Sequence, residues 1–228
     1  MKILSLDTST PLLTMAISEG EKILFEYERH ADRECNKFLF PMMKEMFDKT
    51  GLSLDDMDAF AAGIGPGSFT GTRVGVTVIK GLAYFKKKPV VGISSLDIIA
   101  SGLQGIITGL ICPIIDARRN NLYSAIYEKN DGRLTRISDY LLVSLPELLS
   151  RLNEDVFFLG DGLVLHRREI LNKIPRAKIA ANHFWYPKAA NLGIIANEKL
   201  SQGKEDSLFD LVPLYLYSKE CTVQVKAK

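Results

Sequence analysis

The feature that most constrains this chain is a repeated order of apolar segments. In the first half we predict strands at 3–7, 13–18 and 22–28, a helix at 33–49, a strand at 59–64, a helix at 69–85, a strand at 90–93, and a helix that begins after residue 94 or 95. In the second half we predict strands at 110–116, 122–127 and 134–143, a helix after 144–147, a strand at 156–160 and a helix at 163–172. This repetition predicts an α/β protein of two lobes in the order βββαβαβα, each with a mixed sheet.

The repeat also suggests where the lobes divide. We expect an N-terminal lobe at 1–104 and a smaller, divergent C-terminal lobe at 105–228, whose last helix, at about 187–203, packs back on the first lobe. The uncharged stretch 98–115 approaches the length of a membrane span, but glycines and Pro113 divide it into a helix end, a turn and a strand. We therefore expect no membrane association.

Composition limits the cellular compartment and the classes of partner that we expect for this chain. The 228 residues carry 29 basic and 27 acidic side chains, a net charge of +2, so the chain as a whole lacks the positive charge that drives nonspecific nucleic-acid binding. Cys35, Cys112 and Cys221 are far apart and form no C-x-x-C pair, which argues against disulfides and thiolate metal sites. The first residues do not resemble a signal peptide. These features predict a cytoplasmic protein.

Two aspartates follow apolar strands at equivalent places in the two halves. Asp7 is followed by Thr8, Ser9 and Thr10, and Asp116 is followed shortly by Arg118. Because the carboxyl ends of strands face the ligand crevice of open α/β sheets, we expect these residues to face each other across a cleft. The two aspartates could then hold Mg²⁺ through water. A simple turn-capping role is the alternative for either aspartate taken alone.

A glycine-rich segment, residues 65–71, lies between a predicted strand and a predicted helix. Gly65 and Gly67 allow sharp turns and close approach of the backbone, while Ser68 and Thr70 can cap the helix or offer hydroxyl groups. The start of a helix is also a site for anions. An anion site and an ordinary tight turn are about equally consistent with this spacing, and no Gly-Lys-Ser/Thr completes a Walker A loop.

Together these segments resemble the TsaB (YeaZ) family. The resemblance rests on residues 3–10, the GPGSFTG segment at 65–71 with Arg73 after it, and the segments at 92–96, 115–119, 160–162 and 213–216. It covers nearly the whole chain in order. The resemblance implies the actin-like ATPase fold, in which a ribonuclease H-like unit is duplicated.

The resemblance also implies a function. The family supplies a partner subunit that binds and stabilises TsaD, the subunit that threonylcarbamoylates the adenosine next to the anticodon of tRNAs. TsaE, an ATPase, joins the same complex, and TsaB itself is regarded as non-catalytic and forms a homodimer when alone. We therefore expect contact with tRNA only through the complex. Older descriptions class the superfamily as glycoprotein endopeptidases.

The histidines and cysteines bear on that older label. A zinc peptidase of this fold needs two imidazoles on one helical face, whereas His30, His166 and His183 form no pair at a spacing of three to five residues. Many relatives carry a histidine where this chain has Cys35, which is better explained as a packing residue than as a nucleophile. We expect neither a metal site nor a catalytic residue, with an M22-type glycopeptidase as an alternative.

The remaining alternative is a stand-alone kinase of the same fold. The first phosphate loop of such proteins normally reads Asp-x-Gly-Thr, and here Ser9 replaces the glycine that lets phosphate approach the backbone. We expect no tightly bound cofactor in the isolated chain, and ATP or ADP with Mg²⁺ only in the assembled complex.

A broad apolar face predicts a partner surface. The helix at 33–49 spreads its apolar side chains over more than one core contact needs, and the next helix has glycines that allow close approach. The predicted interface residues are Phe38, Met42, Met43, Met46, Phe47, Gly71, Arg73 and Gly75. The alternatives are that the rest of the chain covers the methionine face and that the glycines face only their own sheet.

Overall fold

A computed structural model describes residues 1–31, 34–103, 105, 107–152 and 155–217. Its first sheet has the strand order β3-β2-β1-β4-β5. The strands are β1 (Lys2–Asp7), β2 (Leu12–Glu19), β3 (Lys22–His30), β4 (Ala59–Gly63) and β5 (Val90–Ile93). The first three form an antiparallel meander, and β4 and β5 run parallel to β1. Buried apolar runs in β4 and β5 are typical of strands covered on both faces, and the predicted meander is confirmed.

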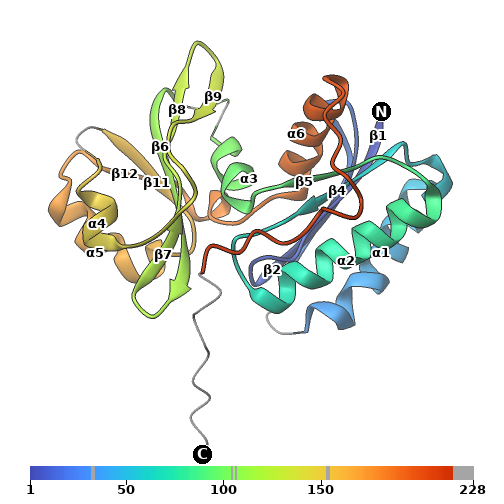
Figure 1. Cartoon of the computed structure of the whole chain (residues 1–228), viewed down its shortest axis with the longest axis horizontal. Coiled ribbons are helices and arrows are strands. Elements are labelled where there is room, and N and C mark those ends of the chain that lie inside the picture. The colour runs from blue at the N-terminus through green and yellow to red at the C-terminus, as the bar shows by residue number, and fades with distance from the viewer. Residues whose placement is uncertain (32–33, 104, 106, 153–154, 218–228) are drawn as a thin grey trace, which may run out of the picture.

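Helices cover both faces of this sheet. Alternate residues of β1 point to opposite sides, so Leu4 packs with residues of α1 (Cys35–Thr50) and α2 (Phe69–Lys86), whereas Ile3 packs with Leu192 of α6 (Ala189–Ser201). Figure 1 shows α1 and α2 on the outer side of the sheet and α6 on its other side. The last helix, from the second half of the sequence, thus completes the core of the first lobe.

The second sheet has the order β10-β7-β6-β11-β12, with β8 paired to β6 and β9. Its strands are β6 (Gly109–Arg118), β7 (Asn121–Ser124), β8 (Tyr127–Asn130), β9 (Arg133–Arg136), β10 (Leu141–Ser144), β11 (Val156–Leu159) and β12 (Lys178–Ile179). Two helices accompany it, α4 (Leu145–Leu149) and α5 (Leu163–Lys173). None of the helices in the described ranges is both long enough and apolar enough to cross a membrane.

The second and third predicted strands of this lobe are each divided in two. β7 and β8 continue one register against β6, with Ile114 opposite Ser124 and Ile111 opposite Tyr127. Between them, the Ile126 N–H donates to the side-chain hydroxyl of Ser138 at 2.8 Å instead of to a strand carbonyl. This side chain replaces a ladder partner, so the expectation of uninterrupted strands at 122–127 and 134–143 was wrong. β12 was not predicted, because two residues are too short to show a periodic pattern.

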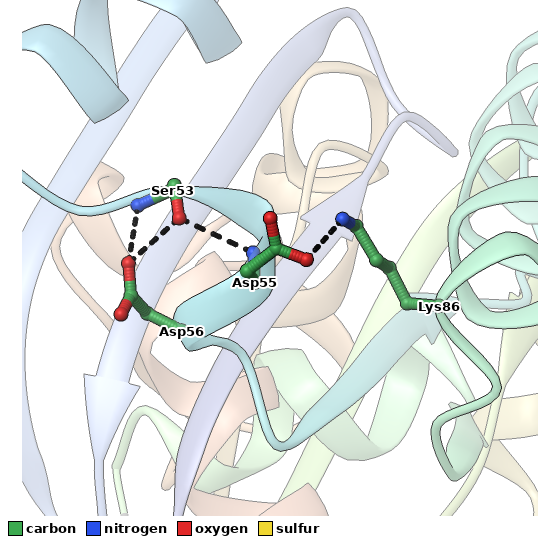
Figure 2. A network of polar contacts seen from close by, with 4 residues as sticks. All are labelled: Ser53, Asp55, Asp56 and Lys86. Atoms are coloured by element: carbon green, nitrogen blue, oxygen red, sulfur yellow. Dashed lines mark hydrogen bonds and ion pairs between the residues drawn. The ribbon is translucent and has the colours of Figure 1, made fainter.

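The segment that connects α1 with β4 is attached to the C-terminal end of α2 by a short network of polar contacts. Ser53 and Asp56 form a capping box around the 3₁₀ turn η1 (Leu54–Asp56), with both the Ser53 N–H and its hydroxyl 2.8 Å from Asp56 Oδ2. The neighbouring Asp55 forms an ion pair with Lys86 in the last turn of α2 (Figure 2). The long α2 helix is therefore held at its C-terminal end as well as at the glycine-rich segment.

The lobes are joined by α3 (Ser95–Ser101) and by the chain end. Leu96 and Ile99 of α3 lie in the core of the second lobe, and both oxygens of Asp97 accept hydrogen bonds from that lobe, from the hydroxyls of Tyr127 (2.6 Å) and Tyr140 (2.7 Å). Because Ile98 of the same helix packs with Leu192 in the core of the first lobe, α3 contributes to both cores. The boundary at residue 104 stays a prediction, because α3 and α6 each pack across it.

Residues 204–217 form a segment that we call the C-terminal strap. Asp206 pairs with the free edge of β5: its N–H donates to the Val90 carbonyl at 2.9 Å and its carboxylate accepts from the Gly92 N–H at 2.7 Å. At its far end, the Tyr217 hydroxyl donates to the Ala117 carbonyl of the second lobe at 2.8 Å. The strap, red in Figure 1, covers a sheet edge and bridges both lobes.

Candidate functional site

Asp7 lies beneath the cleft floor and does not face the cleft. Its Oδ1 accepts hydrogen bonds from the N–H and hydroxyl of Ser9, both at 2.8 Å, and its Oδ2 lies 3.1 Å from the Ser95 hydroxyl. A Cβ on Gly63 would lie only 1.8 Å from Oδ2, so β4 closes the other side. Burial raises the pKa of Asp7, and the hydrogen bonds from Ser9 and Ser95 oppose that rise. The expectation that Asp7 faces Asp116 across the cleft was wrong, because the serines and Gly63 enclose its carboxylate.

The loop after β1 and the glycine-rich segment pack directly on each other. The Ser68 N–H donates to the Ser9 carbonyl at 2.6 Å, and a Cβ on Gly67 would lie 2.2 Å from that same oxygen. Gly65 has a φ of 85° and precedes a cis bond to Pro66, which turns the chain into α2. Two backbone N–H groups at this helix start, those of Ser68 and Gly71, are thus bonded within the chain, which favours the tight-turn interpretation of this segment.

The glycines of α2 serve the same internal contact. A Cβ on Gly71 would lie 2.1 Å from the Thr8 carbonyl, and one on Gly75 would lie 2.3 Å from Thr8 Oγ1. The buried Thr8 hydroxyl donates to the Gly71 carbonyl at 2.6 Å. The assignment of Gly71 and Gly75 to a partner interface was therefore wrong, since both face the loop after β1. The recurrence of glycine at positions 67, 71 and 75 was the available signal that a backbone approaches α2.

A cavity of about 630 Å³ lies between the lobes. Of the residues predicted to face the cleft, Ser9, Thr10, Gly67, Ser68, Asp116 and Arg118 line it. Asp7, Thr8 and Gly65 are buried away from it, and Thr70 is exposed outside it. The sequence reasoning missed the lining residues Glu34, Tyr123 and Asp161. Asp161 follows a strand in the same way as Asp116, and that signal could have identified it.

The second-lobe wall of the cavity is a connected polar cluster. Asp161 Oδ1 accepts a hydrogen bond from the Asp116 N–H at 3.0 Å, and the Asp116 carboxylate binds Arg118 through its N–H at 2.8 Å and its guanidinium at 2.9 Å. Burial raises the pKa of Asp161, and the charge of Asp116 raises it further. This wall therefore contains Asp161, a carboxylate whose charged form is disfavoured by burial, and Arg118, which is already paired with Asp116.

The turn between β6 and β7 holds this cluster in a strained backbone. Arg118, Arg119 and Asn120 have φ values of 65°, 52° and 60°, a left-handed conformation that non-glycine residues rarely adopt. Residues 119 and 120 form the two-residue loop of the hairpin, and positive φ at both is the geometry of a type I′ turn.

The charges of the cavity do not suit a nucleotide. Glu34, Asp116 and Asp161 contribute carboxylates, whereas Arg118 contributes one guanidinium that Asp116 already binds. A triphosphate would meet net negative charge, and the N–H groups of Ser68 and Gly71 are already bonded. The residues of this chain alone therefore do not fit the nucleotide that the fold would imply.

The structure also places the residues considered for metal or nucleophilic chemistry. Within the described ranges, no three His, Cys, Asp or Glu side chains lie close enough to hold a metal ion together. His30 packs edge-on against Tyr186, a packing role. Burial raises the pKa of the Cys35 thiol and raises that of Cys112 to about 12, so both are poor nucleophiles. Cys221 lies outside the described residues.

The methionine face of α1 is internal. Met42, Met43 and Met46 are buried in the core between α1, α2 and the first sheet, so their assignment to a partner surface was wrong. The reason is that β2 and β3 extend far enough to cover this face of α1. Phe38 and Phe47 pack partly buried against the same core, and the Arg29 guanidinium covers the Phe38 ring at 3.9 Å.

Other aromatic side chains are exposed instead. Phe40 of α1 and Phe69, Tyr84 and Phe85 of α2 are between 56% and 75% exposed. The Arg73 guanidinium lies 3.6 Å from the centre of the Phe69 ring, and its Nε donates to the hydroxyl of Tyr215 in the strap at 2.6 Å. Arg73 thus ties the strap to α2, with its guanidinium over Phe69 at the end of the glycine-rich segment.

Comparison with known proteins identifies relatives over almost the full length. Residues 28–225 match the model of a family described as TsaD: tRNA N6-adenosine threonylcarbamoyltransferase. The chain is 29% identical over 222 residues to the tRNA threonylcarbamoyladenosine biosynthesis protein TsaB of Bacillus subtilis (strain 168), with 95% of this chain and 94% of that protein covered. It is 30% identical over 227 residues to the protein of the same name from Haemophilus influenzae, with coverage of 95% and 93%.

Solved structures show the same relationship. YeaZ from Pseudomonas aeruginosa superposes with a TM-score of 0.78 at 27% identity, covering 94% of this chain and 99% of that one. The activator of the 2-hydroxyisocaproyl-CoA dehydratase from Clostridium difficile, solved with bound ADPNP, gives a TM-score of 0.50 at 14% identity, with coverage of 91% and 99%. The second likeness concerns the fold alone. The predicted α/β fold with an actin-like duplication is confirmed.

Proposed function

This chain belongs to the TsaB (YeaZ) family of tRNA threonylcarbamoyladenosine biosynthesis proteins, and we propose that it works as a non-catalytic partner subunit. In this role it binds and stabilises a TsaD-like subunit that carries out threonylcarbamoylation.

The observation that carries the proposal is where the exposed aromatic side chains gather. Every exposed Phe or Tyr side chain of the described residues lies on α1, on α2 or in the C-terminal strap that packs on α2. They are Phe40, Phe69, Tyr84, Phe85, Phe209 and Tyr215. Aromatic residues are enriched at protein interfaces and rarely gather on a solvated face of a monomer. This α1–α2 face is therefore our candidate for the TsaD-like subunit, and for a second copy of the chain when it is alone.

The cleft supports a non-catalytic role. Its two loops bond to each other through Ser9 and Ser68, Asp7 is enclosed, and Arg118 is paired with Asp116. A kinase of this fold would need groups free to hold phosphate and to bind its metal ion. These internal bonds count against phosphate transfer by this chain alone.

We further propose where the other components act. ATP or ADP with Mg²⁺ binds only after a partner contributes groups that this cleft lacks, and a TsaE-like ATPase joins the assembled complex. The tRNA is recognised in that complex and not by the isolated chain. The free thiols of Cys35 and Cys112 suit the reducing cytoplasm.

Reconstitution tests this function. Purified TsaD-like and TsaE-like proteins from the same cell, with tRNA, ATP and the threonylcarbamoyl donor, should modify tRNA only when this chain is added. The chain alone should give no product and no ATP turnover. Full modification in its absence, or turnover by the chain alone at an ordinary enzymatic rate, would contradict the proposal.

A further inference from the structure

Residues 163–178 of the second lobe are one of two strongly basic stretches of the chain, the other being residues 73–88, where Arg73 and Lys80 bond to the strap and Lys86 pairs with Asp55. Residues 163–178, which include α5 and the start of β12, carry five cationic side chains and one carboxylate, Glu169, a net charge of +4. The cations are Arg167, Arg168, Lys173, Arg176 and Lys178. Because the whole chain has a net charge of +2, the remaining residues sum to −2. We call the exposed side of α5 that carries Arg167 and Arg168 the basic face.

These cations are exposed, and most have no carboxylate partner. Arg176 forms an ion pair with Asp155 at 2.7 Å. For Arg167, Arg168 and Lys173, the described part of the chain provides no ion pair, while the Lys178 amine lies 5.1 Å from the centre of the Phe157 ring. Elsewhere, exposed cations of the helices are commonly paired, as Lys44 is with Asp48 and Lys49 with Glu45. The basic face thus keeps its charge available for a partner.

The two arginines flank exposed aliphatic side chains on one side of α5. Leu163 and Ile170 point into the core, whereas Val164, Arg167, Arg168 and Leu171 follow the i, i+3, i+4, i+7 spacing of a single helix face. Val164 is 70% exposed and Leu171 is 38% exposed. A merely solvated helix face would not need apolar side chains between its charges. This arrangement offers guanidinium groups to anions and aliphatic carbons to a less polar surface between them.

We propose that the basic face binds the sugar–phosphate backbone of the tRNA when the complex is assembled, an inference that rests on the proposed function. Guanidinium groups match phosphate oxygens in pairs, and the aliphatic side chains between them can pack on ribose. Interfaces with nucleic acid carry far more positive charge than interfaces between proteins. The net charge of +4 in a family that modifies tRNA favours RNA over an acidic protein as the occupant.

The position of the basic face allows both surfaces to be used at once. Figure 1 shows α5 on the outer side of the second lobe, at the opposite end of the molecule from α1 and α2. A TsaD-like subunit on the α1–α2 face would leave α5 uncovered by this contact. The tRNA could therefore reach both subunits of one complex.

The test measures tRNA affinity of the complex as a function of salt. Fluorescence anisotropy with a labelled, unmodified tRNA transcript would compare the wild-type complex with one that contains Arg167→Gln and Arg168→Gln. The double variant should bind roughly tenfold more weakly, and the slope of log K against log salt should fall by between about one and two, as expected for two lost phosphate contacts. A matched variant, Lys22→Gln with Arg133→Gln, removes the same charge from exposed sites away from α5 and should bind as the wild type does.

Two further readouts separate this surface from the proposed function. The arginine variant should still co-purify with the TsaD-like subunit and should modify tRNA at a normal rate once tRNA is saturating. Unchanged tRNA affinity in the arginine variant would overturn the basic face, as would loss of the TsaD-like subunit with tRNA affinity retained, which would make it a protein interface. If this chain proves dispensable for modification, the proposed function itself fails, whatever the arginine variant does.

Discussion

The backbone N–H of Ser68 donates to the carbonyl oxygen of Ser9 across 2.6 Å, and this bond joins the loop after β1 to the glycine-rich segment. Ser9 also gives its own N–H and hydroxyl to Asp7. The floor of the cleft is therefore a self-satisfied network, and its stability depends on close backbone packing that only glycine permits.

Replacing Gly71 tests that packing. The methyl group of Gly71→Ala would lie 2.1 Å from the Thr8 carbonyl, a backbone atom that cannot easily move, so we expect a loss of about 2 kcal/mol in the free energy of unfolding. Gly81→Ala is the matched control in the same helix, where a Cβ meets open space and the higher helix propensity of alanine should stabilise by up to about 1 kcal/mol. Urea unfolding followed by circular dichroism measures both, and equal effects would contradict the packing.

The raised pKa of Asp7 predicts a pH-dependent stability. Because the folded protein binds this proton more readily than the unfolded chain, the contribution of Asp7 is most favourable at low pH and is lost as pH rises through its folded pKa. Asparagine keeps the oxygen that accepts from Ser9 and carries no charge. Asp7→Asn should therefore gain stability over the wild type as pH increases, measured by urea unfolding across the acid range. Glu21→Gln, an exposed change in the β2–β3 turn, should show no such trend; a trend shared by both variants would count against Asp7 as its source.

The exposed aromatic side chains of the α1–α2 face predict that a substitution there can weaken assembly without affecting the stability of the folded chain. Phe85 is 75% exposed, so Phe85→Asp should change the free energy of unfolding by no more than about 0.5 kcal/mol while weakening self-association and binding of the TsaD-like subunit. Met46 is fully buried, and Met46→Asp should destabilise by more than about 4 kcal/mol because it buries an unpaired charge.

Sedimentation velocity and thermal unfolding provide the measurements for these variants. Ile137→Asp places the same charge on an exposed apolar residue of the second lobe and should leave assembly unchanged. A Phe85→Asp protein that still self-associates and binds the TsaD-like subunit as the wild type does would exclude this face.

Two buried hydroxyl groups next to α6 predict that substitutions at Ser18 and Gly193 affect the free energy of unfolding in a non-additive way. Ser5 and Ser18 have buried side-chain oxygens without a hydrogen-bond partner among the described residues, and a Cβ on Gly193 would lie 2.5 Å from Ser18 Oγ. Ser18→Ala should be neutral or stabilising by up to about 1 kcal/mol, since it removes an unsatisfied polar group. Gly193→Ala alone should destabilise, and it should cost less when Ser18→Ala has made room for the methyl group. A double-mutant cycle measures this coupling, and strictly additive effects would rule out the contact.

The sequence pattern was sufficient for elements whose periodicity reflects a single environment. The meander and the parallel strands after it were predicted because apolar runs and turn residues mark them directly. The two long strands of the second lobe were predicted without their interruption, because the Ser138 side chain replaces a backbone partner of Ile126, and periodicity does not report such a substitution.

The site shows the same limit more strongly. The pattern placed Asp7 and Asp116 at the ends of equivalent strands, but only the tertiary structure shows that Gly63 and Ser95 enclose the first and that Asp161 accompanies the second. The apolar arc of α1 likewise indicated how much apolar surface the helix carries. It did not show that Met42 and Met46 are buried in one cluster with residues of β3. The spacing of residues along a chain identifies an apolar face of a helix, whereas contacts with segments distant in the sequence determine whether that face is exposed to solvent.

The packing of α6 and the C-terminal strap on the first sheet has a consequence for biosynthesis. A ribosome releases residues 2–93 long before residues 189–217, so the nascent first lobe emerges with one sheet face and the β5 edge still bare. Folding domain by domain during translation cannot complete here. The first lobe can therefore complete its core and cover its sheet edge only after the ribosome has released α6 and the C-terminal strap.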